Sequence, residues 1–444
     1  MIVVAAGVLS AVFLGAVALH HPKYLAPIFL AVGLLACRPS AVGERWPWLG
    51  PAIVLIGAAL TLLTPKDDEP ARRIPAWPGV VFFAGYVWLI LRESLVGDDA
   101  FSLVSSSVSV FLPVLAFLLA ARNLEVQRKT SNVFVWIITA SSASVVVSMA
   151  LGLIVGYGAL RLGALPIGYE RLGSGLMFPF SLTYGNSSDG VTRFLGLGRE
   201  PGMGAIFIGY AFFAMPAVKR AILYRGVLLV ALMGTLSTAG IGLFAVALGL
   251  YFVFGSKKRN LIVRAAAIGA SVWAINVALY DTRFGFLSKI ETVSNLDRTR
   301  ATTAGIEAFF NNPFLATTNM PLSSINMVAG IALTGAPWFL LMLAYMASPV
   351  LHGGMRRWQT YAGGFILVTM LTSQPLYGST SVMILVIMLL SSIRRDVPTL
   401  GGDMDPVTGG RAAETYPDRR VVGGKRGNGV KSSPGLLAPQ RLQR

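Results

Sequence analysis

The sequence predicts an all-α polytopic membrane protein, a bundle of about 12–14 transmembrane helices. The 444-residue chain is 54% hydrophobic and only 13% charged, whereas soluble domains contain roughly 25% charged residues. Apolar runs long enough to cross a ~30 Å hydrocarbon core recur along most of the chain. Because a span in lipid must satisfy its own backbone hydrogen bonds, each run is expected to form a helix.

The apolar runs are separated mostly by short polar connections. Two of the runs, Tyr24–Cys37 and Gly79–Leu91, are short enough to be tilted or re-entrant, so the number of spans is a range. No basic segment precedes the first run, which is therefore expected to be a retained helix. In chain order the expected spans are Ile2–Leu19, Tyr24–Cys37, Trp48–Thr64, Gly79–Leu91, Phe101–Ala121, Asn132–Leu160, Gly202–Val218, Ala221–Leu236, Gly240–Gly255, Leu261–Tyr280, Ile325–Ala347, Gln359–Ser373 and Ser381–Ile393.

Basic residues in the short loops predict the orientation, because cytoplasmic loops are enriched in lysine and arginine. If the spans alternate, most basic loops fall on one side, which is predicted to be cytoplasmic together with the C-terminus. Two long segments, residues 161–201 and 281–324, then face outward and are expected to be ordered loops that form an external cavity. The loop with Arg38 and Arg45 also falls on the outer side, against the rule.

The last part of the chain has a different composition. Residues 396–444 are basic and rich in glycine, proline and serine, and they are predicted to form a disordered cytoplasmic tail after a transmembrane domain of residues 1–395. Such a tail is attracted to anionic lipid headgroups. Loops and tail account for the net charge of +17, so nucleic acid is not expected as a partner.

Several kinds of site are not expected. The single cysteine, Cys37, excludes an intramolecular disulfide, and the three histidines show no metal-ligand spacing, so no metal and no other cofactor is predicted. The apolar spans contain almost no ionisable residue, whereas ion-coupled transporters carry such residues at membrane depth. The serine-rich stretch Ser141–Ser148 is expected to let helices pack closely.

Candidate chemistry is therefore concentrated in the two outer loops. The first ends with Arg193, Arg199 and Glu200, and the second contains Arg298 and Arg300. A guanidinium group is always charged and its planar fork matches phosphate oxygens, so arginines from both loops are expected to converge on a pyrophosphate. Alternatively, these arginines anchor the loops to headgroups or pair with acidic residues of the loops. Those acidic residues are Glu170, Asp189, Glu291 and Asp297.

A motif ends the first outer loop. The segment Arg193–Pro201 reads Arg-x-x-Gly-x-Gly-x-Glu-Pro and is followed by an apolar span. It resembles the signature of the O-antigen ligase and polymerase superfamily of bacterial membrane glycosyltransferases. Arg193 also fits an Arg-x10-Gly spacing, with Gly204 as the glycine.

Two later segments are similar to the same family. Thr235–Gly240 occupies the place of a family turn between two helices, and Arg298 precedes Asn312-Pro313 as the family's second-loop arginine precedes an Asn-Pro. The resemblance covers about Arg193 to Tyr345.

The chain departs from the family pattern at four places, one of which is the segment Phe314–Thr318, which replaces the Gly-x-Gly usual after Asn-Pro. Thr238 stands where a basic residue is common, and Phe309 stands where a second Arg-x10-Gly spacing would need glycine. Ser324 stands where the ligases of the family tend to have a loop histidine.

The resemblance implies transfer of a glycan from a polyprenyl pyrophosphate at the outer face of the bacterial cytoplasmic (inner) membrane. Arg193 and Arg298 are the implied catalytic arginines, which would stabilise the leaving pyrophosphate without a metal. Glu200 is a candidate for activating the acceptor hydroxyl. The implied substrate-binding residues are Arg199, Arg300, Gly196 and Ser237.

The expected function is polymerisation of lipid-linked oligosaccharide repeat units into a cell-surface polysaccharide. One alternative is a ligase that moves a finished glycan to another acceptor. The other is a non-catalytic transporter or flippase of lipid-linked glycan, which would need a polar path through the bundle. The expected partners are the polyprenyl-pyrophosphate-linked glycan, membrane lipids, and a polysaccharide flippase or chain-length regulator.

Overall fold

The structure is a computed structural model that describes residues 22–63, 75–96, 100–165, 174–184, 192–216, 218–254, 260–280, 293–316, 326–352, 357–374 and 378–391. The chain divides into two units, Met1–Arg395 and Asp396–Arg444, and the second lies wholly outside the described residues. The predicted tail of residues 396–444 and the expected span Ile2–Leu19 also lie outside them and stay predictions.

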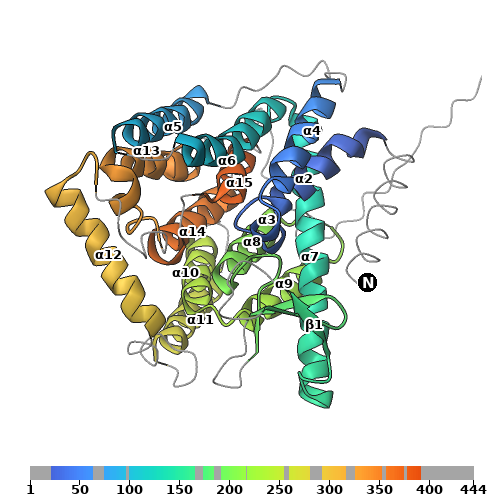
Figure 1. The fold of residues 1–444 in the computed structure, drawn as a ribbon. Coiled ribbons are helices and arrows are strands. Elements are labelled where there is room, and N and C mark those ends of the chain that lie inside the picture. The colour runs from blue at the N-terminus through green and yellow to red at the C-terminus, as the bar shows by residue number, and fades with distance from the viewer. Residues whose placement is uncertain are drawn as a thin grey trace, which may run out of the picture. The chain divides into compact units, whose positions relative to one another are not determined.

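Helices make up most of the described chain, as the sequence predicts (Figure 1). Each expected span from Tyr24–Cys37 onward overlaps one helix. The helical elements are η1 (Pro22–Tyr24), α2 (Leu25–Ala36), α3 (Ala41–Arg45), α4 (Leu49–Leu63), α5 (Ala76–Val96), α6 (Ala100–Ala120), α7 (Leu124–Val155), α8 (Pro201–Ala214), α9 (Ala221–Gly234), α10 (Thr238–Phe254), α11 (Leu261–Tyr280), α12 (Val293–Asn311), α13 (Ile331–Leu351), α14 (Arg357–Ser373) and α15 (Thr380–Ser391).

Three of the described helices, α5, α7 and α13, are long and apolar enough to cross a membrane. Several shorter apolar helices accompany them. The fold is therefore mostly helical, and three candidate membrane spans among the described helices are compatible with a membrane protein. The number of 12–14 spans stays a prediction.

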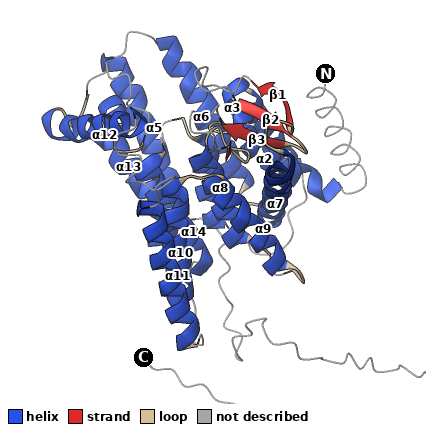
Figure 2. Ribbon diagram, turned by 90° about the horizontal axis from the view of Figure 1, so that it is seen from below, coloured by secondary structure: helices blue, strands red, loops and turns tan. Residues whose placement is uncertain are grey.

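A small β-sheet occupies the first predicted outer loop, where the all-α prediction is wrong. Its strands β1 (Arg161–Leu165), β2 (Ser174–Met177), β3 (Ser181–Tyr184) and β4 (Arg193–Phe194) form one antiparallel sheet in the order β1-β2-β3-β4 (Figure 2). No strand exceeds five residues, which is too short for a clear alternation of apolar and polar side chains.

Serine hydroxyls of α7 hold this sheet. Ser148 donates to the carbonyl of Phe178 over 2.6 Å, and its hydroxyl oxygen lies 2.9 Å from that of Ser181. The hydroxyl of Ser144 lies 3.0 Å from that of Ser181 and accepts a bond from the Phe180 N–H. Ser144 and Ser148 of the Ser141–Ser148 stretch therefore bind the sheet, whereas helix packing was expected of the whole stretch.

The second predicted outer loop is also partly regular. Helix α12 covers Val293–Asn311 within it. The turn that follows α12 packs against α13, because the Ala336 N–H donates to the Pro313 carbonyl over 2.7 Å. Gly335 has φ = 77°, and a β-carbon there would lie 2.3 Å from the Phe314 carbonyl oxygen. Only glycine fits this contact.

Two helices form the buried centre of the described bundle. In α8 eleven of the fourteen residues are buried, and in α15 all twelve are. Helix α8 packs against α7, α9, α10 and α14. A helix that is apolar on every side lies in a protein core or in lipid, and here other helices surround it. The motif that precedes α8 is thereby attached to one of the two most enclosed helices among the described residues.

Helices α2 and α4 approach each other closely at two glycine residues. A β-carbon on Gly33 would lie 2.7 Å from the Val54 backbone nitrogen, and one on Gly57 would lie 2.9 Å from the Leu30 nitrogen. Gly33→Ala should therefore push α4 away and lower the free energy of unfolding by about 1–3 kcal/mol. Thermal unfolding of the purified protein in detergent measures this change.

Gly269 in α11 is the matched control for Gly33→Ala. A β-carbon there meets nothing within 4 Å, so Gly269→Ala should leave stability unchanged or raise it by up to about 1 kcal/mol through helix propensity. Equal melting temperatures for the two variants would contradict the close approach of α2 and α4.

Candidate functional site

The segment between β4 and α8 folds as a tight turn. The Leu195 N–H donates to the Leu182 carbonyl over 2.8 Å, which continues the pairing of the sheet. The Gly198 N–H then donates to the Leu195 carbonyl over 3.2 Å. Gly196 has φ = 59°, in the left-handed region that glycine adopts at little cost. Gly196 therefore shapes the turn through its backbone.

The same turn packs directly on the first turn of α8. A β-carbon on Gly198 would lie 2.5 Å from the Gly204 backbone nitrogen, and one on Gly204 would lie 2.2 Å from the Leu195 carbonyl oxygen. Neither position has room for a side chain. Gly198 of the motif and Gly204, the glycine of the Arg-x10-Gly spacing, thus share one physical reason, the close approach of two backbones.

A short segment from the beginning of the chain pairs with this turn. Ser40 forms an antiparallel bridge with Gly198, and the Arg199 N–H donates to the Pro39 carbonyl over 3.0 Å. Ser40 also caps α3, since its hydroxyl accepts from the Gly43 N–H over 2.9 Å. The loop with Arg38, which violated the charge rule, therefore lies at the same end of the bundle as the motif.

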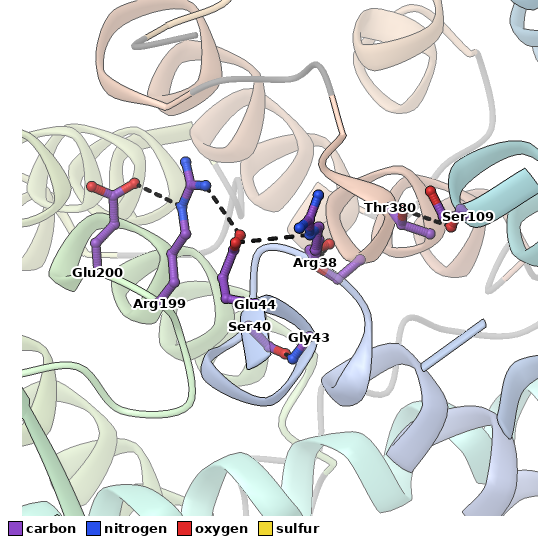
Figure 3. A network of polar contacts seen from close by, with 9 residues as sticks. Arg38, Ser40, Gly43, Glu44, Ser109, Arg199, Glu200 and Thr380 are labelled. Carbon is purple, nitrogen blue, oxygen red and sulfur yellow. Dashed lines mark hydrogen bonds and ion pairs between the residues drawn. The ribbon is translucent and has the colours of Figure 1, made fainter. Parts of the chain in front are cut away.

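Four charged side chains form one network across this contact (Figure 3). Glu44 lies 3.1 Å from Arg199 and 3.8 Å from Arg38, and Arg199 lies 3.5 Å from Glu200. The side chains of Glu44, Arg199 and Glu200 are only 14%, 16% and 22% exposed. Removing one partner of such an enclosed pair leaves a charge without its counter-charge. Arg199 is therefore matched by two carboxylates, as the alternative of structural pairing predicts.

The other predicted arginines have no such match among the described residues. Arg193 in β4 and Arg298 in α12 are half-buried and Arg300 is exposed, and no carboxylate described here lies within ion-pair distance of them. The acidic residues suggested as partners, Glu170, Asp189 and Glu291, are outside the described residues, as is the side chain of Asp297. Arg193, Arg298 and Arg300 thus differ from Arg199.

One helical turn after Arg298, helix α12 is hydrogen-bonded to the segment that precedes α13. Thr302 donates its hydroxyl to the Arg298 carbonyl over 2.7 Å and accepts from the side-chain amide of Asn326 over 2.8 Å. Asn326 is buried and accepts from the Ala329 N–H over 2.7 Å. The two segments touch at Gly305, where a β-carbon would lie 2.2 Å from the Val328 carbonyl oxygen.

The same turn connects α12 with the motif through the end of α14. The Met327 N–H donates to the Met370 carbonyl over 3.1 Å. Four residues later, the side chain of Gln374 lies against Gly202, in the first turn of α8. The structure thus brings α12 and the motif to one end of α14. No contact between described residues joins Arg193 to Arg298 directly.

The predicted binding residue Ser237 also lies near the first turn of α8. Its hydroxyl accepts from the Gly240 N–H over 3.3 Å and so caps α10. A β-carbon on Gly240 would lie 2.6 Å from that of Ala205 in α8. Ser237 therefore has a role in local structure, and its turn packs beside the motif.

Two charged residues were missed by the sequence reasoning. One is Glu44, whose partner Arg199 is 155 residues away. The other is Arg92, which was placed just after the span ending at Leu91 but lies inside α5 and is 2% exposed. Arg92 pairs with Glu93 and donates to the Leu315 carbonyl over 3.0 Å. It therefore holds the turn that follows α12.

Among the described residues, no group of three or more histidine, cysteine, aspartate or glutamate side chains could hold a metal ion. Comparison of the chain with models of protein families, with curated proteins and with solved structures finds no match.

The contact between Glu44 and Arg199 predicts strong energetic coupling. In a double-mutant cycle of Glu44→Ala and Arg199→Ala, the double variant should be more stable than the sum of the single losses by about 1–3 kcal/mol, because each single change removes the nearest counter-charge of an enclosed group. Thermal unfolding of the four proteins in detergent gives this coupling energy.

The Glu125–Lys129 pair on α7 provides the control cycle. Ion pairs of this i,i+4 type couple by only about 0.2–0.5 kcal/mol. A coupling for Glu44 and Arg199 that is no larger than the control would show that the network does not hold the turn.

Proposed function

We propose that the chain is a membrane glycosyltransferase of the O-antigen polymerase type, which joins lipid-linked oligosaccharide repeat units at the outer face of the bacterial inner membrane. The main support is the arrangement of the two arginine segments. The motif is held at the N-terminus of α8 and α12 lies at the same end of α14, while Arg193 and Arg298 are not paired with a described carboxylate.

The proposed reaction is a substitution at the anomeric carbon of the donor sugar. The acceptor hydroxyl loses its proton and forms the new glycosidic bond as the bond to the pyrophosphate oxygen breaks. Polyprenyl pyrophosphate leaves with increased negative charge. Arg193 and Arg298 stabilise this charge, because fixed donors act most strongly where charge develops in the transition state.

The geometry changes the roles proposed for the remaining residues. Arg199 holds Glu200 and α3 in place, because two carboxylates already occupy its guanidinium group. Glu200 stays the candidate for activating the acceptor hydroxyl at the start of α8. Arg300 is exposed and available for the donor phosphates. Gly196 shapes the turn and Ser237 supports it from the start of α10.

The apolar character of the bundle's centre favours an enzyme over a flippase. A flippase needs a polar path for a glycan, whereas the central helices α8 and α15 are apolar and buried over almost their whole length. No specific observation favours a ligase over a polymerase.

The proposed topology can be tested by cysteine labelling, since the single native cysteine is buried. Phe180 in the sheet and Lys219 between α8 and α9 are both exposed, but they are proposed to face opposite sides. A membrane-impermeant maleimide should label Phe180→Cys in intact spheroplasts, and Lys219→Cys only after permeabilisation. The opposite pattern would contradict an outer location of the motif.

The proposed reaction predicts that two arginines are both essential for polymer formation. Arg193→Ala or Arg298→Ala should reduce polymer formation by about a hundredfold or more, because a preorganised donor to the transition-state charge is lost. Arg193→Lys should also be impaired, since an ammonium group cannot make the bidentate contact. Gel analysis of cell-surface polysaccharide, with immunoblots of the membrane fraction, measures both effects.

Arg161→Ala is the matched control for these variants. Arg161 is an exposed arginine of the same sheet, in β1, and its removal should leave polymer length and yield unchanged. Normal polymer from both Arg193→Ala and Arg298→Ala would refute the proposed roles.

A further inference from the structure

Helix α12 packs through small residues. Among its described residues the buried ones are Ala301, Ala304 and Gly305, and a β-carbon on Gly305 would lie 2.2 Å from the Val328 carbonyl oxygen. Alanine and glycine bury little apolar surface, so this face contributes little to the free energy that orients the helix. The rotation of α12 about its own axis therefore depends strongly on polar contacts.

One such contact lies a helical turn after Arg298. The Thr302 hydroxyl donates to the Arg298 carbonyl over 2.7 Å and accepts from Nδ2 of Asn326 over 2.8 Å. The bond to the carbonyl four residues earlier fixes the direction of the hydroxyl. Residues four apart share one face of a helix, so Arg298 and Thr302 lie on the same side of α12. The Asn326 amide thereby meets α12 at one defined rotation.

The Asn326 amide is itself held firmly. Its side chain is 3% exposed, and its Oδ1 accepts from the Ala329 N–H over 2.7 Å. The Asn326 backbone carbonyl accepts from the Gly330 N–H, and the next residue, Met327, donates to the Met370 carbonyl at the end of α14, each over 3.1 Å. Both ends of the amide are thus used, and the amide connects the position of α14 to that of α12.

We infer that Thr302 and Asn326 are positioning residues, which hold α12 in the rotation that presents Arg298 to the donor pyrophosphate. This inference rests on the proposed function and deepens it, because it identifies what places one of the two proposed catalytic arginines. A shift of about 1 Å in a catalytic group can cost about a hundredfold in rate. The turn that Arg92 holds lies beyond the other end of α12, farther from Arg298 than the Thr302 contact is.

The first test removes the Thr302 hydroxyl and keeps the shape of the side chain. With purified full-length protein and the lipid-linked repeat unit, Thr302→Val should lower kcat about tenfold or more and change KM much less, because Arg298 is misplaced in the transition state. Thr302→Ser keeps the hydroxyl and should stay close to wild type. Thr303→Val makes the same change at the next, exposed position and should have no effect. Melting temperatures in detergent show that each variant is folded at the assay temperature.

A double variant shows whether Thr302 acts through Arg298. The protein with both Arg298→Ala and Thr302→Val should have the same kcat as Arg298→Ala alone, because no guanidinium group is left to misplace. A merely structural role of Thr302 would lower kcat again by the factor seen in the single variant, and that result would contradict the inference.

The position of α12 can also be measured without the reaction. Cys37 is buried, so spin labels can be attached to Leu296→Cys in α12 and Phe180→Cys in the sheet, which are exposed positions. Pulsed electron resonance then measures the distance distribution between the two labels. It should be narrow in the labelled parent and in Thr302→Ser, and broader or shifted in Thr302→Val.

The two measurements separate the inference from the proposed function. An unchanged distance distribution or an unchanged kcat in Thr302→Val would overturn the positioning role. A folded parent protein that elongates no glycan would reject the proposed function, while the label distances would still show whether the Thr302 hydroxyl holds α12.

Discussion

The candidate site depends on the close packing of the turn at residues 195–198 on the first turn of α8. Two glycines make this contact possible, because a β-carbon on Gly198 or Gly204 would overlap the opposite backbone. Close-packed interiors do not absorb such an overlap without displacement. The contact fixes β4 on one side and Arg199 on the other, and α3 pairs with the same turn. The network of Arg38, Glu44, Arg199 and Glu200 takes its position from there.

The arginines of the site differ in what surrounds them. Arg199 lies between Glu44 and Glu200, so its charge is compensated. Arg193 and Arg298 lie on β4 and α12 without a described carboxylate nearby. A compensated guanidinium stabilises the fold, whereas an uncompensated one remains available for an anion such as pyrophosphate. The structure thus separates Arg199, which is paired with carboxylates, from Arg193 and Arg298, which no described carboxylate pairs.

The order of the helices could be predicted from the sequence, because each depends on a local apolar run. The strands β1–β4 could not be predicted, since none exceeds five residues. Helix α12 could not be predicted either, because a polar helix lacks the apolar pattern of a span. The Glu44–Arg199 contact joins residues far apart in the chain, for which a single sequence carries no signal. The only sequence feature that pointed to this contact was the basic loop around Arg38, which fell on the unexpected side of the membrane.

The central claim is that this chain elongates a lipid-linked glycan with its arginines as the source of electrostatic stabilisation. The most direct measurement incubates the purified protein in lipid nanodiscs, with EDTA present, with polyprenyl-pyrophosphate-linked repeat unit from its host. We predict longer lipid-linked glycans, together with one released polyprenyl pyrophosphate for each repeat unit added. Intact substrate after prolonged incubation with folded protein would contradict the claim.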